Sequence, residues 1–232
     1  MGVIENVPRH IAIVPDGNRR WAALKGVHKI EGHQAGADRM HLVVENLLPL
    51  GVKYLTVWGF STDNWKRTDD EVQSLFKLLE FWIRKDTPWL HEKNVRLKHI
   101  GRFHELPQGL QAAIGAAIAL TEHNSGMTLI LAFNYTGRAE IVDAVNRLLK
   151  EWLPWNTVDE NRFSHYLYTD GAPDVDLVIR TADEFRLSNF MLWQTAYSEY
   201  YFTPVFWPDF DRLELEKALA AYRQRDRRFG GD

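Results

Sequence analysis

Three short polar segments of the sequence carry arginine beside small residues, a combination suited to binding a diphosphate. They read PDGNRRWA at 15–22, FSTDNWKR at 60–67 and RTADEFRLSN at 180–189. Arginine offers phosphate oxygens a planar fork of N–H donors. In the first segment, Gly17 permits a tight turn with exposed backbone N–H groups, and Asp16 can hold a divalent cation that bridges to the phosphates. These residue types together indicate metal-assisted diphosphate chemistry.

Each segment also has a plainer interpretation. Asp-Gly-Asn is a common turn. His33, in EGHQAG, can donate to the same anion or simply lie beside a helix cap. Ser61 or Thr62 can cap the element that follows. Arg67 and the nearby Trp65 instead fit a charged pocket with one aromatic wall. Both interpretations stay open on the residues alone.

The third segment and the C-terminal region offer further anion or metal ligands. Arg180 and Arg186 lie six positions apart, so one loop can bring both to a diphosphate, while salt bridges to nearby acids are the competing explanation. Glu199, in AYSEYYF, has aromatic neighbours, and a half-buried carboxylate there needs a donor or a cation, of which a metal is one. The ending RRFGG, with Arg228 and Gly230, reads as a solvated basic tail or as an ordered anion contact.

Strand and helix patterns alternate between these segments. Short β-rich apolar runs predict buried strands, and the stretches between them repeat apolar residues at helical spacing. The alternation favours a mostly parallel sheet covered by helices on both faces, and ligands in such sheets bind beyond the carboxyl ends of the strands. Each polar segment lies at the end of a predicted strand. The predicted strands are 11–15, 52–60, 95–100, 127–133 and 175–179.

Composition narrows the class of protein. The chain has 232 residues, 45% of them hydrophobic, and no linker divides it, so we expect a single domain over 1–232. The net charge of -3 gives no general attraction to nucleic acid. The absence of cysteine excludes disulfides and zinc-thiolate sites, and favours a reducing cytoplasm. We see no transmembrane run, signal peptide, P-loop, dinucleotide fingerprint, zincin motif or nucleophile elbow.

Five ordered segments resemble the cis-prenyltransferase (isoprenyl transferase) family, which includes undecaprenyl diphosphate synthase. They are HIAIVPDGNRRWA, FSTDNWKR, NYTGRAEIVDA, DLVIRTADEFRLSNFMLWQTAYSEYYFTPVFWPDF and RRFGG, within residues 10–231. The resemblance implies an α/β fold with a mainly parallel six-stranded central sheet, flanked by helices that form an elongated hydrophobic tunnel. It also implies a homodimer that condenses isopentenyl diphosphate in cis onto an allylic diphosphate of farnesyl or geranyl type, with Mg²⁺ as cofactor.

The same resemblance implies roles for individual residues. Asp16 coordinates Mg²⁺ and assists departure of the allylic diphosphate, with Glu199 as the second protein ligand. Asn64 occupies the position linked to proton removal; an amide is a weak base, so a relay through water or phosphate is needed. Arg228 and Gly230 reach a diphosphate across the dimer interface. The other substrate-binding residues are Gly17, Asn18, Arg19, Arg20, Trp21, Lys29, His33, Ser61, Thr62, Asp63, Trp65, Arg67, Arg180, Arg186, Leu187 and Ser188.

Three positions depart from the pattern of the family. Pro15 stands where Met is usual, Lys29 where Arg is usual, and Ala182-Asp183 where two glycines precede the acid. Replacing the glycines restricts the loop between the two arginines. The departures keep open a short-chain, branching or cyclising synthase of the same fold, and a noncatalytic scaffold subunit is a further alternative.

Product length depends on the side chains that close the tunnel. Gly59 is small near the expected tunnel mouth and permits elongation, while Phe76, Phe81, Trp82 and Phe133 are bulky candidates for a limit. We expect a medium-chain product of undecaprenyl type, with a short-chain product as the alternative. An amphiphilic product implies transient membrane contact for its release from a cytoplasmic enzyme.

Overall fold

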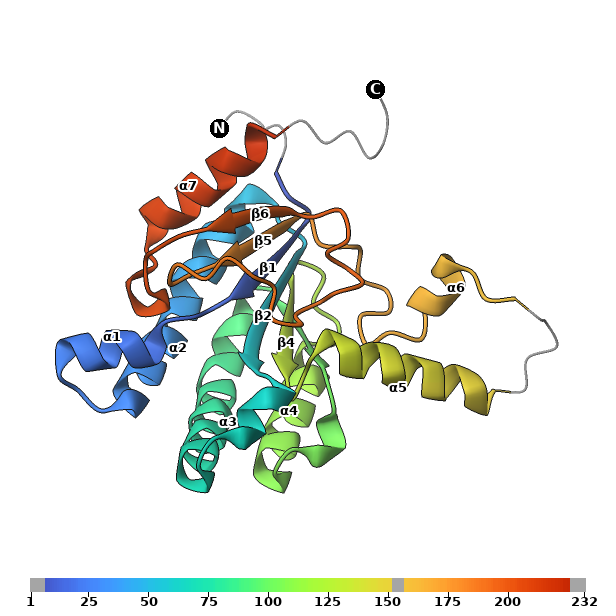
Figure 1. Cartoon of the computed structure of the whole chain (residues 1–232), viewed down its shortest axis with the longest axis horizontal. Helices are drawn as coiled ribbons and strands as arrows, with labels where there is room; N and C mark the ends of the chain where they lie inside the picture. Colours follow the sequence, from blue (N-terminus) through green and yellow to red (C-terminus); the bar gives the residue numbers. More distant parts are fainter. Residues whose placement is uncertain (1–6, 152–156, 226–232) are drawn as a thin grey trace.

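One six-stranded sheet forms the centre of the protein (Figure 1). The computed structural model describes residues 7–151 and 157–225. Neighbouring strands all pair in parallel, in the order β3-β4-β2-β1-β5-β6. The strands are β1 (His10–Val14), β2 (Tyr54–Phe60), β3 (Arg96–Ile100), β4 (Thr128–Phe133), β5 (Leu177–Arg180) and β6 (Glu199–Phe202).

Helices connect most of the strands. They are α1 (Asn18–Lys25), α2 (Lys29–Leu47), α3 (Asp69–Glu92), α4 (Gln108–Thr121), α5 (Gly137–Lys150), α6 (Glu160–Ser164) and α7 (Arg212–Arg223). In Figure 1, α5 and α6 extend to one side of the sheet, away from α1 and α2. Within residues 7–151 and 157–225, no helix is both long and apolar enough to cross a membrane.

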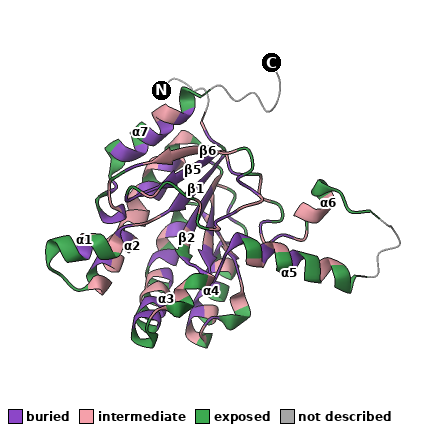
Figure 2. Ribbon diagram, viewed as in Figure 1, coloured by how far each residue is buried: buried purple, intermediate pink, exposed green. Residues whose placement is uncertain are grey.

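The two faces of the sheet are covered differently. Ile11 and Ile13 of β1 belong to a large core that α2, α3, α4 and α7 complete. The alternate residues Ala12 and Val14 face the opposite side, in a smaller core whose members outside the sheet, such as Phe190, lie in irregular segments. Figure 2 shows β1 and β5 buried, β6 only partly buried, and the outer helix faces exposed. The helical cover expected on both faces is therefore found mainly on one.

The five strands predicted from apolar runs are confirmed, with ends shifted by one or two residues. The sheet of six strands that the resemblance implied is also confirmed, and it is parallel throughout. The sixth strand, β6, gave no clear pattern because it is an edge strand whose four residues, EYYF, are all only partly buried. The single domain over 1–232 stays a prediction.

The direction of strand addition changes at β1. This strand pairs with β2 on one side and with β5 on the other, and Val14 is in register with Arg180. The carboxyl ends of β2, β1 and β5 are consequently neighbours at one edge of the sheet. Such a switch point is where open parallel sheets bind ligands. The fold thus brings the three arginine-bearing segments together.

Candidate active site

Asp16 and Arg180 join the loops that follow β1 and β5. Arg180 is 4% exposed, and its Nη2 and Nε donate to Oδ2 of Asp16 at 2.7 and 3.1 Å. The Nη1 atom of Arg180 donates to Oγ of Ser188 at 2.9 Å. Charge-assisted hydrogen bonds of this kind hold both partners in place. The structure therefore brings three of the predicted site residues into direct contact.

Two residues that sequence reasoning missed fix the turn after β1. Oγ1 of Thr181 accepts a hydrogen bond from the backbone N–H of Asp16 at 2.8 Å and donates to its carbonyl oxygen at 2.7 Å. The backbone N–H of Trp207 donates to the same carbonyl oxygen at 2.9 Å. The only signal for them was position, Thr181 beside a strand-end arginine and Trp207 within the WPDF sequence. Both hold the Asp16 backbone, and Trp207 also lines the cavity described below.

Gly17 forms the turn that begins α1. Its φ is 100°, a left-handed conformation that glycine adopts at little cost. A Cβ atom at Gly17 would also lie 2.6 Å from the ring of Phe206 and 2.9 Å from Cβ of Ala182. No described side chain caps α1, so its first backbone N–H groups are open to an anion. The turn is consistent with the diphosphate cradle inferred from the sequence.

Three cations beside this turn share one buried carboxylate, that of Glu71 in the first turn of α3. Glu71 lies 2.7 Å from Nζ of Lys29, 3.2 Å from Nη1 of Arg67 and 3.7 Å from Nη1 of Arg19. Burial raises the pKa of Glu71, but the hydrogen bond from Lys29 and the two guanidinium charges outweigh it, so the pKa is lower than usual. Sequence reasoning missed Glu71, although its i, i+4 spacing from Arg67 was an available signal.

His33 lies among these cations and is neutral near pH 7. Burial and then the charge of Arg67 lower the pKa of His33 to about 4. Burial also lowers the pKa of Arg67, against the opposing charge of Glu71. The Nε2 atom of His33 is buried and has no hydrogen-bond partner among the described residues. In the Nε2–H tautomer, this imidazole can donate to an anion in the cavity that it lines.

Glu184 organises the loop after β5. It accepts a hydrogen bond from Nη2 of Arg20 at 2.9 Å and pairs with Nη1 of Arg186. The salt-bridge explanation considered for Arg186 is thus what the structure shows. Ala182 and Asp183 have φ values of 70° and 58°, in the region that favours glycine. This backbone geometry accounts for glycines being usual there in the family that the sequence resembles.

The loop after β2 is a short 3₁₀ helix, η2 (Thr62–Lys66), with a capping box at its start. Oγ of Ser61 accepts a hydrogen bond from the backbone N–H of Asp63 at 3.2 Å. Oδ1 of Asn64 in turn accepts one from the backbone N–H of Ser61 at 3.0 Å. The capping interpretation is confirmed. Because the amide oxygen of Asn64 is already engaged, its NH₂ group is the part that stays available to a ligand.

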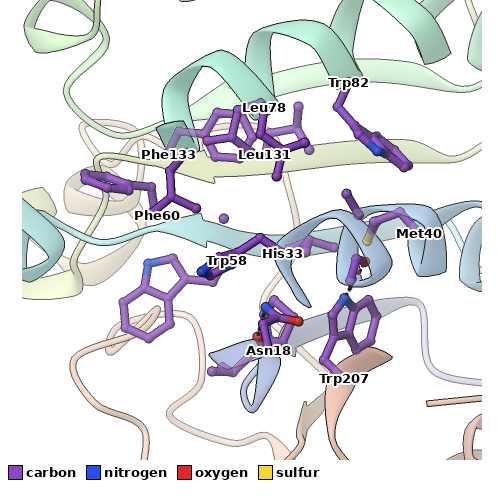
Figure 3. A pocket seen from close by; sticks show the side chains of 18 of the residues that line it. Asn18, His33, Met40, Trp58, Phe60, Leu78, Trp82, Leu131, Phe133 and Trp207 are labelled. Atoms are coloured by element: carbon purple, nitrogen blue, oxygen red, sulfur yellow. Dashed lines mark hydrogen bonds between the residues drawn. The ribbon is translucent and has the colours of Figure 1, made fainter. Parts of the chain in front are cut away.

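These loops open onto one cavity of about 800 Å³ between the sheet, α2 and α3. In Figure 3, Leu78, Leu131 and Phe133 lie on one side of this space and Asn18 and His33 on the other. From Leu75 to Leu90 the cavity follows α3 over about 22 Å, taking the helical rise per residue. Further apolar lining comes from Met40, Val44, Leu75, Leu79, Trp82, Ile83, Trp89, Leu90, Leu97 and Leu129. The arrangement suits a ligand with an anionic head and an apolar tail.

Most of the predicted site residues line this cavity, and some do not. Trp21 donates instead to Oδ1 of Asp209 at 2.8 Å, and Leu187 packs in the smaller core. The lining includes Asp16, Gly17, Asn18, Arg19, Arg20, His33, Ser61, Asp63, Asn64, Arg67, Arg180 and Ser188. Outside the lining lie Trp21, Lys29, Thr62, Trp65, Arg186 and Leu187.

Within one chain Glu199 does not lie at this edge of the sheet and so does not meet Asp16 there; its role as second metal ligand stays a prediction. It begins β6 in register with Leu177, the first residue of β5, whereas Arg180 is the last. Because the strands run in parallel, Glu199 is at the opposite edge, 3.7 Å from Nε of Arg225. The half-buried carboxylate expected in this aromatic run is confirmed, and the cation beside it is a guanidinium. Arg228 and Gly230 lie outside the described residues.

Asp16 by itself fits a magnesium ion that is held jointly with substrate. Both hydrogen bonds from Arg180 go to Oδ2, and Oδ1 has no hydrogen-bond partner in the described part of the chain. Mg²⁺ commonly binds one or two carboxylates together with substrate phosphates and water. No cluster of three or more histidine or acidic side chains that could hold a metal occurs within residues 7–151 and 157–225.

Only some of the bulky residues proposed to limit product length line the cavity. Trp82 and Phe133 line the cavity, whereas Phe76 does not and Phe81 is 56% exposed. A Cβ atom at Gly59 would lie 2.1 Å from Cε1 of Phe133, so the aromatic ring occupies the space that this glycine opens. The expectation that Gly59 leaves room for elongation is therefore corrected, as are the candidacies of Phe76 and Phe81.

Comparisons with known proteins agree with what the geometry of the site indicates. Residues 14–230 match the family described as "Putative undecaprenyl diphosphate synthase". The chain is 49% identical to an isoprenyl transferase of Fusobacterium nucleatum, covering 98% of this chain and 97% of the relative. It is 47% identical to an isoprenyl transferase of Heliobacterium mobile, covering 97% and 88% respectively.

Two solved structures share the fold. A lavandulyl diphosphate synthase from Lavandula x intermedia, solved with dimethylallyl diphosphate, has a TM-score of 0.94 and 40% identity, covering 97% of this chain and 98% of that one. A probable undecaprenyl diphosphate synthase from Campylobacter jejuni has a TM-score of 0.83 and 31% identity, covering 97% and 99%.

Proposed function

Since this chain belongs to the undecaprenyl diphosphate synthase family and is a prenyltransferase, we propose that it condenses isopentenyl diphosphate in cis onto an allylic diphosphate. The observation that carries the proposal is the cavity itself. Its arginine-bearing strand-end loops surround one end, and apolar side chains of α2, α3 and the sheet line the rest. A diphosphate with a hydrocarbon tail matches both halves.

The allylic diphosphate binds beside α1. The open N–H groups of the first helical turn and the side chains of Arg19, Arg20 and His33 donate to its oxygens. Arg67 approaches from the loop after β2 and lines the same end. Lys29 lies behind this group, where its contact with Glu71 holds the carboxylate that orients the guanidinium groups.

Isopentenyl diphosphate binds beside β5. Arg180 and Ser188 already contact each other and line the cavity, and Arg186 joins them when the loop closes on an anion. The NH₂ group of Asn64 orients the phosphate or water that accepts the proton lost when the new double bond forms. Trp65 borders this end through its packing on Phe60, which lines the cavity.

The reaction needs charge stabilisation more than covalent help from the protein. As the allylic diphosphate departs, its negative charge grows, and fixed guanidinium and backbone donors stabilise that charge more in the transition state than before it. When held by Asp16 and the phosphates, Mg²⁺ would supply further positive charge at the same place. The apolar lining keeps water away from the allylic carbon.

The test is incorporation of radiolabelled isopentenyl diphosphate with Mg²⁺ and either geranyl or farnesyl diphosphate. We expect Mg²⁺-dependent products with the wild type and none with Asp16→Ala, whereas Glu216→Gln, an exposed residue paired with Arg212, keeps full activity. Failure to incorporate label with either primer would overturn the proposal. A noncatalytic scaffold has no support, because the relatives are isoprenyl transferases.

Product length separates two candidates. The family description and the isoprenyl transferase relatives favour regular elongation to a medium-chain product of undecaprenyl type. A short-chain or branching synthase is favoured by the likeness to the lavandulyl diphosphate synthase and by the aromatic rings of Trp82, Trp89 and Phe133 along the cavity. Resolving the labelled products by chain length decides between a ladder and a single addition.

We also propose a homodimeric, cytoplasmic enzyme that contacts the membrane transiently to release its product. Arg228 and Gly230 would then contribute to a diphosphate site of the second chain. Light scattering measures the assembly, and flotation with lipid vesicles after turnover measures the contact. A monomer that is fully active would contradict the shared site, and an enzyme that never floats would contradict the membrane step.

A further inference from the structure

Polar atoms lie at the far end of the cavity, inside an otherwise apolar lining. Asp86 is 3% exposed, and together with Trp82 and His41 it lines this end. Oδ2 of Asp86 and Nε1 of Trp82 are both buried, and neither finds a hydrogen-bond partner within residues 7–151 and 157–225. One is an acceptor and the other a donor. The diphosphate chemistry at the opposite end does not use them.

The cluster is held in place from both helices. Trp82 and Asp86 are four residues apart on α3 and so share a face. His41 of α2 meets both: its Nε2 lies 2.9 Å from Oδ1 of Asp86, and its ring packs edge-on against that of Trp82 with centroids 5.3 Å apart. Trp89 stacks on the ring of His41 with centroids 4.2 Å apart. The contact with His41 is at Oδ1 and leaves Oδ2 open; Nε2 of His41 likewise makes no hydrogen bond within the described residues.

Leaving such atoms unpaired is costly. A buried donor or acceptor that has lost water needs a partner from the protein or from a bound molecule. Burial also raises the pKa of Asp86, against the opposing charge of His41. A methyl group or an alkene can pair with neither atom. A hydroxyl group can do both, since it accepts from an indole N–H and donates to a carboxylate.

We propose that the far end of the cavity is a binding subsite for one hydroxyl group, which accepts from Nε1 of Trp82 and donates to Oδ2 of Asp86. The inference rests on the proposed function, because the tail of an allylic diphosphate is what would extend toward this end (Figure 3). The hydroxyl belongs either to an alcohol at the end of that tail or to a water molecule retained beneath a hydrocarbon tail.

Calorimetric titration tests whether the hydroxyl group belongs to an alcohol at the end of the tail. Geranyl and farnesyl diphosphate, each with and without a hydroxyl on the terminal methyl group, are titrated into the wild type, Trp82→Phe and Trp89→Phe. At the length that reaches the far end, the hydroxyl should strengthen binding to the wild type about ten-fold. Trp82→Phe removes the donor and should abolish that gain. Trp89→Phe removes a second indole from the same end and should keep it.

A crystal structure with the hydrocarbon diphosphate tests whether the hydroxyl group belongs to a retained water molecule. An ordered water between Trp82 and Asp86 supports the subsite with water as its occupant, even where the alcohol brings no gain. No gain at either length together with no ordered water overturns the subsite. If neither hydrocarbon diphosphate binds or is condensed, the proposed function fails as well; loss of the hydroxyl preference alone leaves that function standing.

Discussion

Arg180 donates both Nη2 and Nε to a single oxygen of Asp16, at 2.7 and 3.1 Å, and so ties the loop after β5 to the loop after β1. The same guanidinium reaches Ser188 through Nη1. The positive charge of Arg180 and the negative charge of Asp16 thus form an ion pair. A substrate diphosphate would compete with Asp16 for Arg180, whereas Oδ1 of Asp16 stays open to a metal while the ion pair is in place.

Asp16→Asn should lower both activity and stability. It removes the charge that a metal would need, and we expect condensation to fall by about 100-fold or more. It also leaves Arg180, which is almost fully buried, without its anion, and since Asp16 is partly exposed we expect a loss of about 2 kcal/mol in unfolding free energy. Radiolabel incorporation and urea unfolding measure the two effects.

The matched control for this variant is Asp170→Asn. Asp170 pairs with His165 on the surface, where both side chains are exposed, so stability should change by less than about 0.5 kcal/mol. Equal losses in the two variants would mean that the Asp16 pair has no special role in stability.

Glu71→Gln should destabilise the protein at neutral pH and not at acid pH. The folded-state pKa of Glu71 is lower than usual, so its stabilising contribution is complete above the ordinary carboxyl range and is lost as the pH falls through the lowered value. Without this charge, Arg19, Lys29 and Arg67 repel one another, at a cost of about 1 to 2 kcal/mol. Urea unfolding at neutral and acid pH should show the gap between variant and wild type closing on acidification.

Inorganic pyrophosphate offers a second measurement on Glu71→Gln. An anion that binds the three unpaired cations should raise the melting temperature of the variant more than that of Glu216→Gln, whose partner Arg212 is an exposed surface residue. A variant whose gap to the wild type is the same at every pH, or which pyrophosphate does not stabilise, would contradict the role assigned to Glu71.

His33 should stay neutral until a diphosphate binds. Burial and the charge of Arg67 lower its pKa to about 4, and a bound anion would raise it by offsetting the nearby cations. The unfolded chain takes up a proton near the ordinary value of 6.5, so this residue should reduce stability as the pH falls from there toward 4. Imidazole NMR titrations with and without inorganic pyrophosphate measure the change, with His33→Gln identifying the resonance. An unchanged pKa would remove His33 from the anion site.

The sequence predicted the sheet and the loops because both depend on local patterns. Apolar runs mark buried strands, and in a parallel sheet the residues after each strand meet at one edge, so Asp16, Asn64 and Arg180 could be grouped without coordinates. The network behind them was not predicted. Apart from the i, i+4 pair of Arg67 and Glu71, Glu71 and Thr181 act through contacts that the fold creates between distant elements, and neither type of residue is distinctive in a sequence.

Glu199 shows a different limit of sequence reasoning. Its aromatic neighbours indicated a half-buried carboxylate, as found, but strand direction and register, which a sequence pattern does not give, place it at the other edge of the sheet of its own chain. Phe81 is a second residue whose position the sequence pattern did not give. Its bulk made it a candidate beside Trp82, but adjacent helix residues point about 100° apart, and only Trp82 turns toward the cavity.

Trp82→Ala should lengthen the product. The indole occupies the far part of the cavity, and its removal opens space in the path of the growing tail. Resolving labelled products by chain length should show a longer limit than in the wild type. Phe81→Ala is the matched control, since it removes a neighbouring aromatic ring that is 56% exposed and should leave product length unchanged. Identical products from the wild type and Trp82→Ala would mean that other residues set the limit.

Gly59→Ala should clash with Phe133 and lower stability. The new Cβ atom would lie 2.1 Å from Cε1 and 2.6 Å from Cδ1 of the ring, so the ring must leave its position. Overpacking of this kind costs about 2 kcal/mol of unfolding free energy. Adding Phe133→Leu to Gly59→Ala should recover much of that loss, because the smaller side chain vacates the space.

Gly115→Ala is the control for Gly59→Ala and Phe133→Leu. Gly115 lies within α4, and no atom is found within 4 Å of its added Cβ, so alanine there should raise stability by about 0.5 to 1 kcal/mol through helix propensity. Urea unfolding of the four variants should therefore rank Gly115→Ala above the wild type, the double variant above Gly59→Ala, and Phe133→Leu alone below the wild type. A Gly59→Ala protein as stable as the wild type would show that the ring moves aside freely, and the cavity near the strand ends would then be wider than the packed ring indicates.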